Sequence, residues 1–371
     1  MAGKDRFIRA LSLLVLGLST LVTPVSASWT NPLEHFYSQY SHGLQDIIQN
    51  NCSDTYALYL ADRRNVSAIR SELRIFGMHS MNHEMIECIL ENSPELVKSK
   101  MAAAAIVLGL APTIIASLGV RPQDTALLSV VGRRHMLAFA VAVGSPAINA
   151  YRASEYATVI DSLRDRSLKR PSLIRKLDPF ITAFSYILAA ASIANIGELT
   201  YRLGARATFS IVPDAEFMAL LWASLGVLIH FLAGLAMWTR VSSRVQSVDE
   251  DVTKKGPWPV SVAKGQIDIM TRRSKLIFTV HPEFMLFSLL SLITTVFTGC
   301  HIIFGTLVFS SILFVSVNDS LSIVARLMAS AIVTRVIITS ELLALRESVE
   351  ESVDSTVAHN PARLEYQIRM P

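Results

Sequence analysis

Residues 217–238 read FMALLWASLGVLIHFLAGLAMW, a run of 22 residues without a charged side chain. A helix needs about 20 apolar residues to cross the hydrocarbon core of a bilayer. Three other stretches have the length and composition of a span: Met101–Val120, Phe180–Leu199 and Phe284–Val317. The sequence therefore predicts an all-α, polytopic α-helical membrane protein.

The composition of the whole chain agrees with this prediction. Of its 371 residues, 51% are hydrophobic and 17% are charged, and the mean hydropathy is +0.42. These values exceed what the surface of a soluble protein of this size tolerates. Water-soluble globular proteins are thereby excluded.

The last third of the chain predicts two more helices within a transmembrane domain at 101–345. We expect a span at 288–316, a tight polar turn at Asn318-Asp319-Ser320 and a returning span at 321–343. With spans at 101–120, 180–199 and 217–238, the total is five. Residues 346–371 are predicted to be a polar, cytoplasmic tail.

The number of spans depends on Met136–Ala150, fifteen residues that include Gly144 and Pro146. This segment is either a re-entrant helix or a short span. If it does not cross, the basic loops at 152–178 and 239–283, with seven and eight Lys/Arg, are cytoplasmic. If it crosses, both loops face outward, against the positive-inside rule. We favour the arrangement without a crossing.

The first 27 residues are typical of a secretory signal peptide. Basic residues come first, Ala10–Val22 is apolar, and Val25-Ser26-Ala27 suits cleavage. The alternative is a retained signal anchor. In either case residues 28–100 reach the lumen or the cell exterior, which predicts a multi-pass protein of the secretory pathway, in the plasma membrane or an endomembrane.

Residues 28–100 contain no spanning stretch and are predicted to form a small, helical, extracytoplasmic domain. Asn31 and Pro32 suit a helix start. Apolar residues then follow with helical spacing: Leu33, Phe36, Tyr37, Tyr40, Leu44, Ile47 and Ile48. Ser93-Pro94-Glu95 predicts another helix, which continues directly into the first span.

Two of the three cysteines, Cys52 and Cys88, lie in this oxidising segment and predict a disulfide. The alternative is two free thiols. Asn51-Cys52-Ser53 and Asn65-Val66-Ser67 have the form of glycosylation acceptors. Asn51 and Asn65 are therefore candidate glycosylation sites.

Polar side chains at membrane depth are costly unless they are paired or solvated. Four of them form a candidate intramembrane polar site: Asn195, Glu198, His230 and Arg335. A contact of His230 with Glu198 or Asn195 would be either a proton or ligand site or a packing hydrogen bond. Arg335 needs a partner such as Glu341 or a carboxylate on another helix, whereas Arg326 is expected to reach the outer interface.

Motifs for catalysis are missing. No phosphate-binding glycine loop, Ser-His-Asp order or Cys-x-x-Cys pair is present, so no catalytic residue or cofactor is predicted. His79 and His83 have a metal-ligand spacing, but neither zincin pattern has its glutamate here. We predict no metal site and no nucleic-acid partner. The expected contacts are with the bilayer, including anionic lipid headgroups at the basic cytoplasmic loops.

Several segments resemble a family of uncharacterised multi-pass membrane proteins from filamentous fungi, over roughly Met101 to Glu341. They are Leu110-Ala111-Pro112-Thr113, Leu127-Leu128-Ser129 with Arg133-Arg134, Gly144-Ser145-Pro146-Ala147, Leu221-Trp222-Ala223 with Ile229-His230, and Phe304-Gly305-Thr306-Leu307-Val308-Phe309-Ser310-Ser311. The resemblance implies a fungal membrane protein with a signal sequence and a variable lumenal segment, and no activity. His135 replaces a proline of the family pattern.

Three classes of function remain. A non-enzymatic binding, receptor-like or scaffolding protein uses every feature and requires no further site. A transporter or channel would need His230, Glu198 and Arg335 to line one path. A membrane-embedded enzyme would need such groups within hydrogen-bond reach of a bound lipid.

Overall fold

The computed structural model describes residues 33–63, 67, 69–75, 77–149, 177–246, 275–280 and 285–359. The predicted signal peptide, Asn65, the basic residues between 152 and 176, and residues 360–371 lie outside them. The described chain is almost entirely helical, with four strands of two or six residues.

Five helices are long and apolar enough to cross a membrane. They are α6 (Glu95–Leu118), α11 (Asp178–Arg206), α12 (Met218–Arg240), α14 (Met285–Ser310) and α15 (Val317–His359). At 1.5 Å per residue, the 23 residues of α12 extend about 34 Å, enough for a bilayer core of ~30 Å. The prediction of a polytopic α-helical membrane protein is confirmed.

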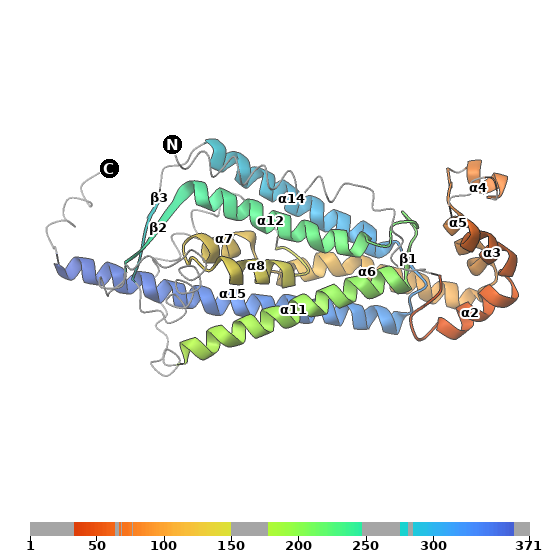
Figure 1. Ribbon diagram of the computed structural model, residues 1–371, viewed down its shortest axis with the longest axis horizontal. Coiled ribbons are helices and arrows are strands. Elements are labelled where there is room, and N and C mark those ends of the chain that lie inside the picture. Colours follow the sequence, from red (N-terminus) through yellow and green to blue (C-terminus); the bar gives the residue numbers. More distant parts are fainter. Residues whose placement is uncertain are drawn as a thin grey trace.

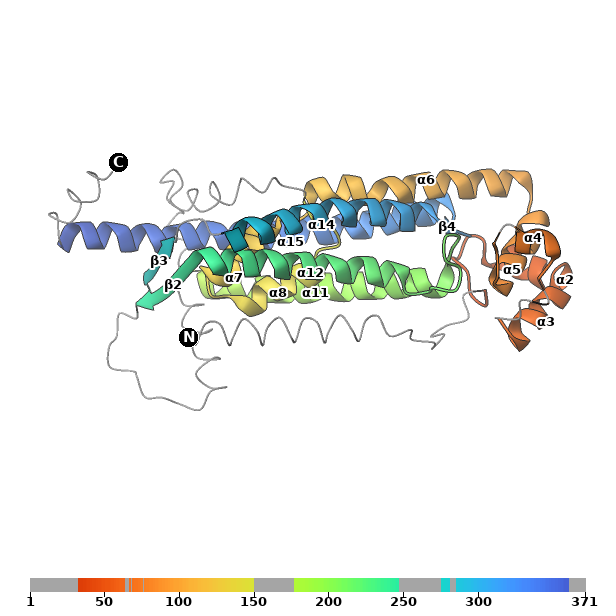
Figure 2. The same cartoon turned by 90° about the horizontal axis from the view of Figure 1, so that it is seen from above.

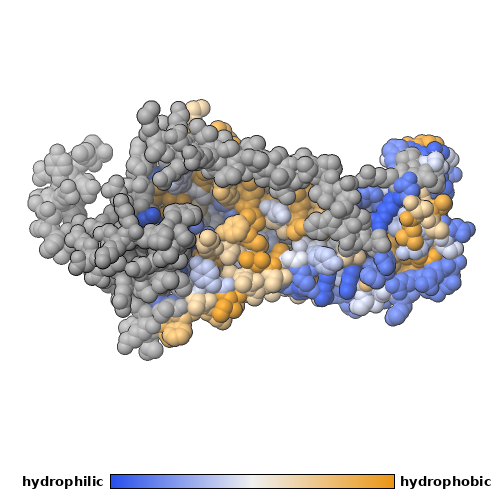
Figure 3. Space-filling model, viewed as in Figure 1, coloured by the Kyte–Doolittle hydropathy of each residue, from blue (hydrophilic) through white to orange (hydrophobic). Residues whose placement is uncertain are grey.

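Large apolar side chains cover the outside of this bundle, as a lipid environment requires. Ile187, Ile303 and Val336 are each more than half exposed. On the face shown in Figure 3, hydrophobic residues gather over the bundle. Hydrophilic residues gather at the right, over the end of the molecule that carries the short helices between residues 41 and 91. Soluble proteins rarely expose apolar surface on this scale.

The long helices are connected alternately at the two ends of the bundle (Figure 1). At one end, β1 (Thr208–Phe209) between α11 and α12 pairs antiparallel with β4 (Ile312–Leu313) between α14 and α15. At the other end, β2 (Val241–Gln246) after α12 pairs with β3 (Lys275–Val280) before α14. We call the end that carries β1 and β4 the docked end, because the described residues between 33 and 93 lie against it.

These residues, the N-terminal segment, contain α2 (Ser41–Asn50), α3 (Ser53–Ala61), α4 (Ser71–Ile75) and α5 (Met81–Glu91). Figure 2 shows them clustered beyond the docked end. The predicted helix start at Asn31 is wrong in position, since α2 begins only at Ser41. Residues 33–40 instead form turns, and these bury Leu33 and Phe36 in the core of the segment.

The N-terminal segment passes into the bundle without a break. Helix α6 begins after Pro94 and runs as one helix to Leu118. This confirms the prediction that the helix starting at residues 93–95 continues directly into the first span.

Between α6 and α11 the chain forms a helical hairpin of α7 (Pro122–Val130) and α8 (His135–Gly144). The hairpin ends beside the residue from which it starts. Val120 and Ile148 form a parallel bridge, and the backbone N–H of Asn149 donates to the carbonyl oxygen of Val120 at 3.3 Å. Helices of nine and ten residues extend about 15 Å, half of a bilayer core. Neither helix is long enough to cross by itself, and the chain leaves the hairpin beside the residue at which it entered.

The predicted turn at Asn318-Asp319-Ser320 is misplaced. Helix α14 ends at Ser310, and the connection to α15 is the apolar stretch 311–316. Ser316 Oγ accepts from the backbone N–H of Asp319 at 3.1 Å and donates to Asp319 Oδ2 at 2.7 Å. This cap starts α15 at Val317 and places the three polar residues in its first turn.

Helix α15 is longer than the predicted span. It continues beyond Arg346 to His359, so residues 347–359 of the expected tail are helical. In Figure 1 this part of α15 projects past the end of the bundle opposite the docked end.

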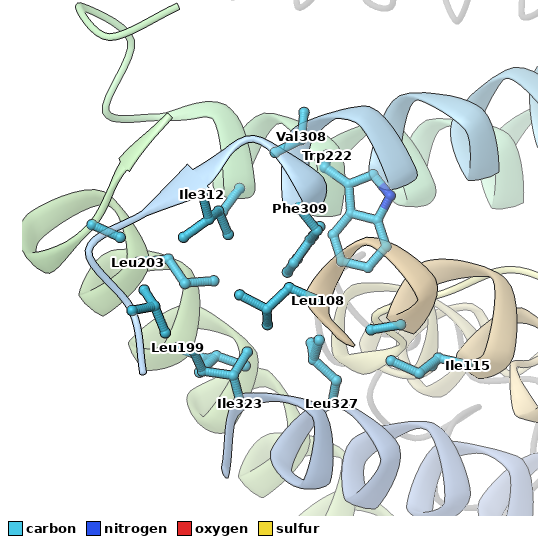
Figure 4. Close-up of a cluster of buried hydrophobic side chains, with 14 of the residues drawn as sticks. Leu108, Ile115, Leu199, Leu203, Trp222, Val308, Phe309, Ile312, Ile323 and Leu327 are labelled. Atoms are coloured by element: carbon cyan, nitrogen blue, oxygen red, sulfur yellow. The ribbon is translucent and has the colours of Figure 1, made fainter. Parts of the chain in front are cut away.

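The largest core of the bundle surrounds Trp222 (Figure 4). Its indole meets the ring of Phe309 edge-on at 4.9 Å and stacks on His301 at 5.2 Å. A β-carbon on Gly305 would lie 2.4 Å from Trp222 Nε1. Glycine at 305 therefore permits α12 and α14 to approach closely.

Candidate functional site

The four predicted intramembrane residues form two separate groups. Asn195 and Glu198 contact Arg326 on α15, toward the docked end. His230 and Arg335 instead contact the first turn of α7. The expected contact of His230 with Glu198 or Asn195 is not formed.

The outer group is a network between α11 and α15. Arg326 Nε donates to Asn195 Oδ1 at 2.8 Å, and its guanidinium pairs with Glu198. Asn195 Nδ2 donates to Ser330 Oγ at 2.8 Å, and Glu198 also pairs with Arg202 one turn further along α11. Arg326 was expected simply to reach the interface, but it is held by hydrogen bonds across two helices.

The inner group joins two helices, α12 and α15, to α7. Arg335 donates to the carbonyl oxygen of Gly119 at 3.2 Å and lies 3.8 Å from a carboxylate oxygen of Asp124. The partner of Arg335 is thus a carboxylate on another helix, one of the two expected alternatives, whereas Glu341 pairs with Arg134. Halfway along α12, His230 Nδ1 lies 2.8 Å from Thr125 Oγ1.

The hydroxyl of Thr125 constrains the protons of His230. Its single proton can go to the carbonyl oxygen of Pro122 at 2.9 Å or to His230 Nδ1. In the first case His230 Nε2 carries a bare lone pair, and in the second it carries the ring proton. In both, the buried Nε2 has no hydrogen-bond partner among the described residues.

A cavity of about 130 Å³ opens beside the outer group, at the docked end. Two consecutive residues of the N-terminal segment, Tyr37 and Ser38, form one wall, and α11 and α15 form the other. The remaining lining residues are Leu199, Arg202, Arg206, Asp319, Ser322, Ile323 and Arg326. The cavity is thus built at the boundary between the N-terminal segment and the membrane bundle.

Tyr37 is the most buried of the polar residues that line this cavity, with 8% of its surface exposed. Burial, with a further contribution from the Asp319 carboxylate, raises the pKa of Tyr37 above its usual value, against the effect of three nearby arginines. The phenol therefore keeps its proton. Its oxygen has no hydrogen-bond partner among the described residues.

Polar contacts hold the N-terminal segment against the docked end. Ser80 Oγ and Asn82 Nδ2 both donate to Asp214 Oδ1, at 2.7 and 2.6 Å. Arg63 lies 3.5 Å from Glu216 in the same connection. These contacts join the N-terminal segment to the connection between α11 and α12.

The predicted pairing of Cys52 with Cys88 is confirmed, whereas glycosylation at Asn51 stays a prediction. Cys52 and Cys88 form a disulfide, which joins the start of α3 to α5. Asn51 is exposed beside it, at the end of α2. Cys300 is a free, exposed cysteine on α14.

The described residues contain no group of three or more His, Cys, Asp or Glu side chains that could hold a metal ion. His79 precedes α5, whereas His83 lies within it. The pair therefore does not share a helical face in the way their spacing suggested.

Sequence reasoning missed the partners of the predicted residues. Asp124 and Thr125 follow Arg121-Pro122, a helix start that stood in an apolar region of undecided topology. His301 donates from Nε2 to the carbonyl oxygen of Trp222 at 2.9 Å, and nothing in the run around it signals this. Pro122, at the first position of α7, was the one local signal that a helix carrying Asp124 and Thr125 begins there.

Comparison of the chain with protein-family models, with curated proteins and with solved structures finds no match.

Proposed function

We propose that this protein is a non-enzymatic, receptor-like binding protein of a secretory-pathway membrane, with its ligand site at the boundary between the N-terminal segment and the bundle. One observation carries the proposal. The cavity at the docked end has a wall from each of these two parts, so its occupant would contact both. A volume of about 130 Å³ suits a small polar group rather than a drug-sized molecule of ~300–1,000 Å³.

The proposal places the docked end outside the cytoplasm. It includes a cleaved signal peptide, glycosylation at Asn51 and Asn65, and basic loops at 152–178 and 239–283 that contact anionic lipid headgroups from the cytoplasm. The alternation of helix ends supports it, because the flanks of both loops lie opposite the docked end: the starts of α11 and α14 and the end of α12.

The alternative functions have less support. A transport path through Glu198, His230 and Arg335 would need the three to line one channel, but they belong to two groups with separate partners. A lipid enzyme would need the same groups to converge on one bound molecule. The buried contacts of His230 suit helix packing.

Binding is tested with the full chain, purified into lipid nanodiscs from the expressing membrane and studied by native mass spectrometry. Ser322→Trp places a bulky side chain at an exposed edge of the cavity, whereas Leu321→Trp changes the neighbouring exposed residue, outside the lining. We expect wild type and Leu321→Trp to retain a small molecule that Ser322→Trp lacks. The same set of bound molecules in all three proteins would contradict the binding function.

Topology is tested separately, with a glycosylation acceptor inserted between residues 152 and 176. The inserted acceptor should remain unmodified in microsomes while Asn51 is modified. Asn51→Gln should abolish the modification at Asn51. Glycosylation of the inserted acceptor would place this loop outside the cytoplasm and remove the proposed orientation.

A further inference from the structure

We infer that the cavity at the docked end binds a phosphate monoester group, supplied by an anionic lipid or by a soluble phosphate. The inference rests on the proposed binding function and specifies its ligand. It is carried by the charges around the cavity, by a buried hydroxyl in its wall and by its place at the edge of the apolar surface.

Three guanidinium groups line the cavity and two carboxylates compensate them. Glu198 pairs with Arg202 and Arg326. Asp319 lines the cavity as well, and one of its oxygens accepts from Ser316. The balance is one positive charge, and Arg206 makes no ion pair with any described residue.

The donors outnumber the acceptors in the cavity wall. Besides the three arginines, Tyr37 presents a protonated, buried hydroxyl that has no partner among the described residues. A buried donor without an acceptor is unfavourable, and an anion with several oxygens would satisfy it. Ser38 and Ser322 add two more hydroxyls to the lining.

This arrangement fits phosphate better than it fits a cation or a neutral group. A guanidinium offers a planar fork of N–H donors that matches phosphate oxygens, and such charge-assisted bonds are the stronger ones. A carboxylate has two oxygens, whereas a phosphate monoester has three terminal oxygens for three arginines and Tyr37. A cation would meet the surplus positive charge.

The cavity also lies where a lipid headgroup would reach it. Tyr201 and Leu321, neighbours of the lining residues Arg202 and Ser322, are 61% and 54% exposed. Exposed tyrosine is typical of the membrane interface. Acyl chains beside these residues would leave the phosphate of the same lipid at the level of the arginines.

The test uses the full chain in phosphatidylcholine nanodiscs and follows the midpoint of thermal unfolding. One series adds phosphatidic acid to the bilayer, and a second adds inorganic phosphate at constant ionic strength. We expect one of the two probes to raise the midpoint in a saturable manner, which also identifies the source of the phosphate. Arg206→Gln loses one charge-assisted contact, so the probe concentration at half-saturation should rise about tenfold.

Two further variants control this result. Arg206→Lys keeps the charge and loses the fork, so its half-saturation should lie between those of wild type and Arg206→Gln. Arg74→Gln removes an exposed charge of the N-terminal segment, outside the cavity lining, and should respond as wild type.

Three results would overturn the inference: no response to either probe, an unchanged response in Arg206→Gln, or an equal loss in Arg74→Gln. Failure of the inference is distinguishable from failure of the binding function. A retained molecule without phosphate that Ser322→Trp lacks would leave the function standing and exclude this ligand class.

Discussion

The side-chain amide of Asn82, in the first turn of α5, donates to Asp214 in the connection between α11 and α12 at 2.6 Å. The two residues are 132 positions apart in the sequence. Their contact holds the N-terminal segment on the membrane bundle, and Ser80 donates to the same carboxylate oxygen. The same segment supplies Tyr37 to the wall of the cavity.

Replacement of Asp214 by alanine is expected to loosen the docking without unfolding the bundle. Two hydrogen bonds are lost, and because Asp214 is exposed, we expect a local destabilisation of about 1 kcal/mol. Amide hydrogen exchange should become faster in α5 and unchanged in α12. Asp54→Ala, an exposed acidic residue of α3, is the control, and equal exchange in both variants would refute a docking role for Asp214.

Gly305→Ala is expected to destabilise the bundle. Its β-carbon would lie 2.4 Å from Trp222 Nε1 and 3.0 Å from Pro112 Cβ, so α12 or α14 must shift, at a cost of about 1–3 kcal/mol. Gly299→Ala, on the same helix, meets no atom within 4 Å and is the matched control. Thermal unfolding in detergent should show a lower midpoint for Gly305→Ala alone, and equal midpoints would mean that the close approach has no energetic role.

The buried pair of Arg134 and Glu341 connects the hairpin turn to α15. Their side chains are 5% and 2% exposed, so removal of one partner leaves a buried charge and should cost about 3–5 kcal/mol. Glu341→Ala should therefore lower the unfolding midpoint strongly, and the double variant Arg134→Met/Glu341→Met should recover most of the loss. A double variant as unstable as the single one would show that the loss comes from packing rather than charge.

The disulfide is expected to stabilise the N-terminal segment. It closes a loop with a sequence separation of 36, which the chain-entropy relation values at about 4 kcal/mol. Cys52→Ser with Cys88→Ser should make this segment sensitive to protease while the bundle remains folded. Cys300→Ser, a free exposed cysteine, should behave as wild type. Equal proteolysis in the two proteins would exclude a stabilising role for the crosslink.

Tyr59 predicts a loss of stability at alkaline pH. Burial raises the pKa of Tyr59 above its usual value near 10. Because the folded pKa is higher than the unfolded one, the contribution is complete below about pH 10 and is lost as the pH rises further. The N-terminal segment should therefore unfold progressively above pH 10, as followed by tyrosine absorbance and hydrogen exchange.

The matching variant is Tyr59→Phe, which removes this titration together with a buried hydroxyl that lacks a partner among the described residues. It should be neutral or slightly stabilising at pH 7 and should delay the alkaline unfolding. Tyr201→Phe changes an exposed tyrosine and should not alter the pH profile. Identical profiles for Tyr59→Phe and wild type would assign the transition to another group.

The lengths of the apolar runs in the sequence predicted where the spanning helices lie, but they predicted the helix ends less well. The run at 217–238 became α12 nearly residue for residue. The run from Phe284 to Val317 did not become one helix, because the Ser316 cap starts a new helix inside it and leaves 311–316 as an apolar connection. Hydropathy detects burial or lipid contact, and it does not distinguish a helix from a buried turn.

The polar partners were beyond sequence reasoning for a different reason. His230 was correctly identified as a residue that must find a contact, but the two acceptors expected on the preceding span, Asn195 and Glu198, bind Arg326 instead. Its partner Thr125 lies on a short helix whose position is decided by the return of the chain to Val120.

The sequence by itself determined the spanning helices, the continuity of α6 with the N-terminal segment and the cysteines that pair. Each follows from local properties: apolar length, a helix-start pattern or a shared oxidising segment. Only the tertiary structure decided the path of the α7–α8 hairpin, the partition of the polar residues into two groups and the cavity at the docked end. These depend on which helix faces meet, and contacts between residues more than 100 positions apart decide that, as between Asn82 and Asp214 or Asn195 and Arg326.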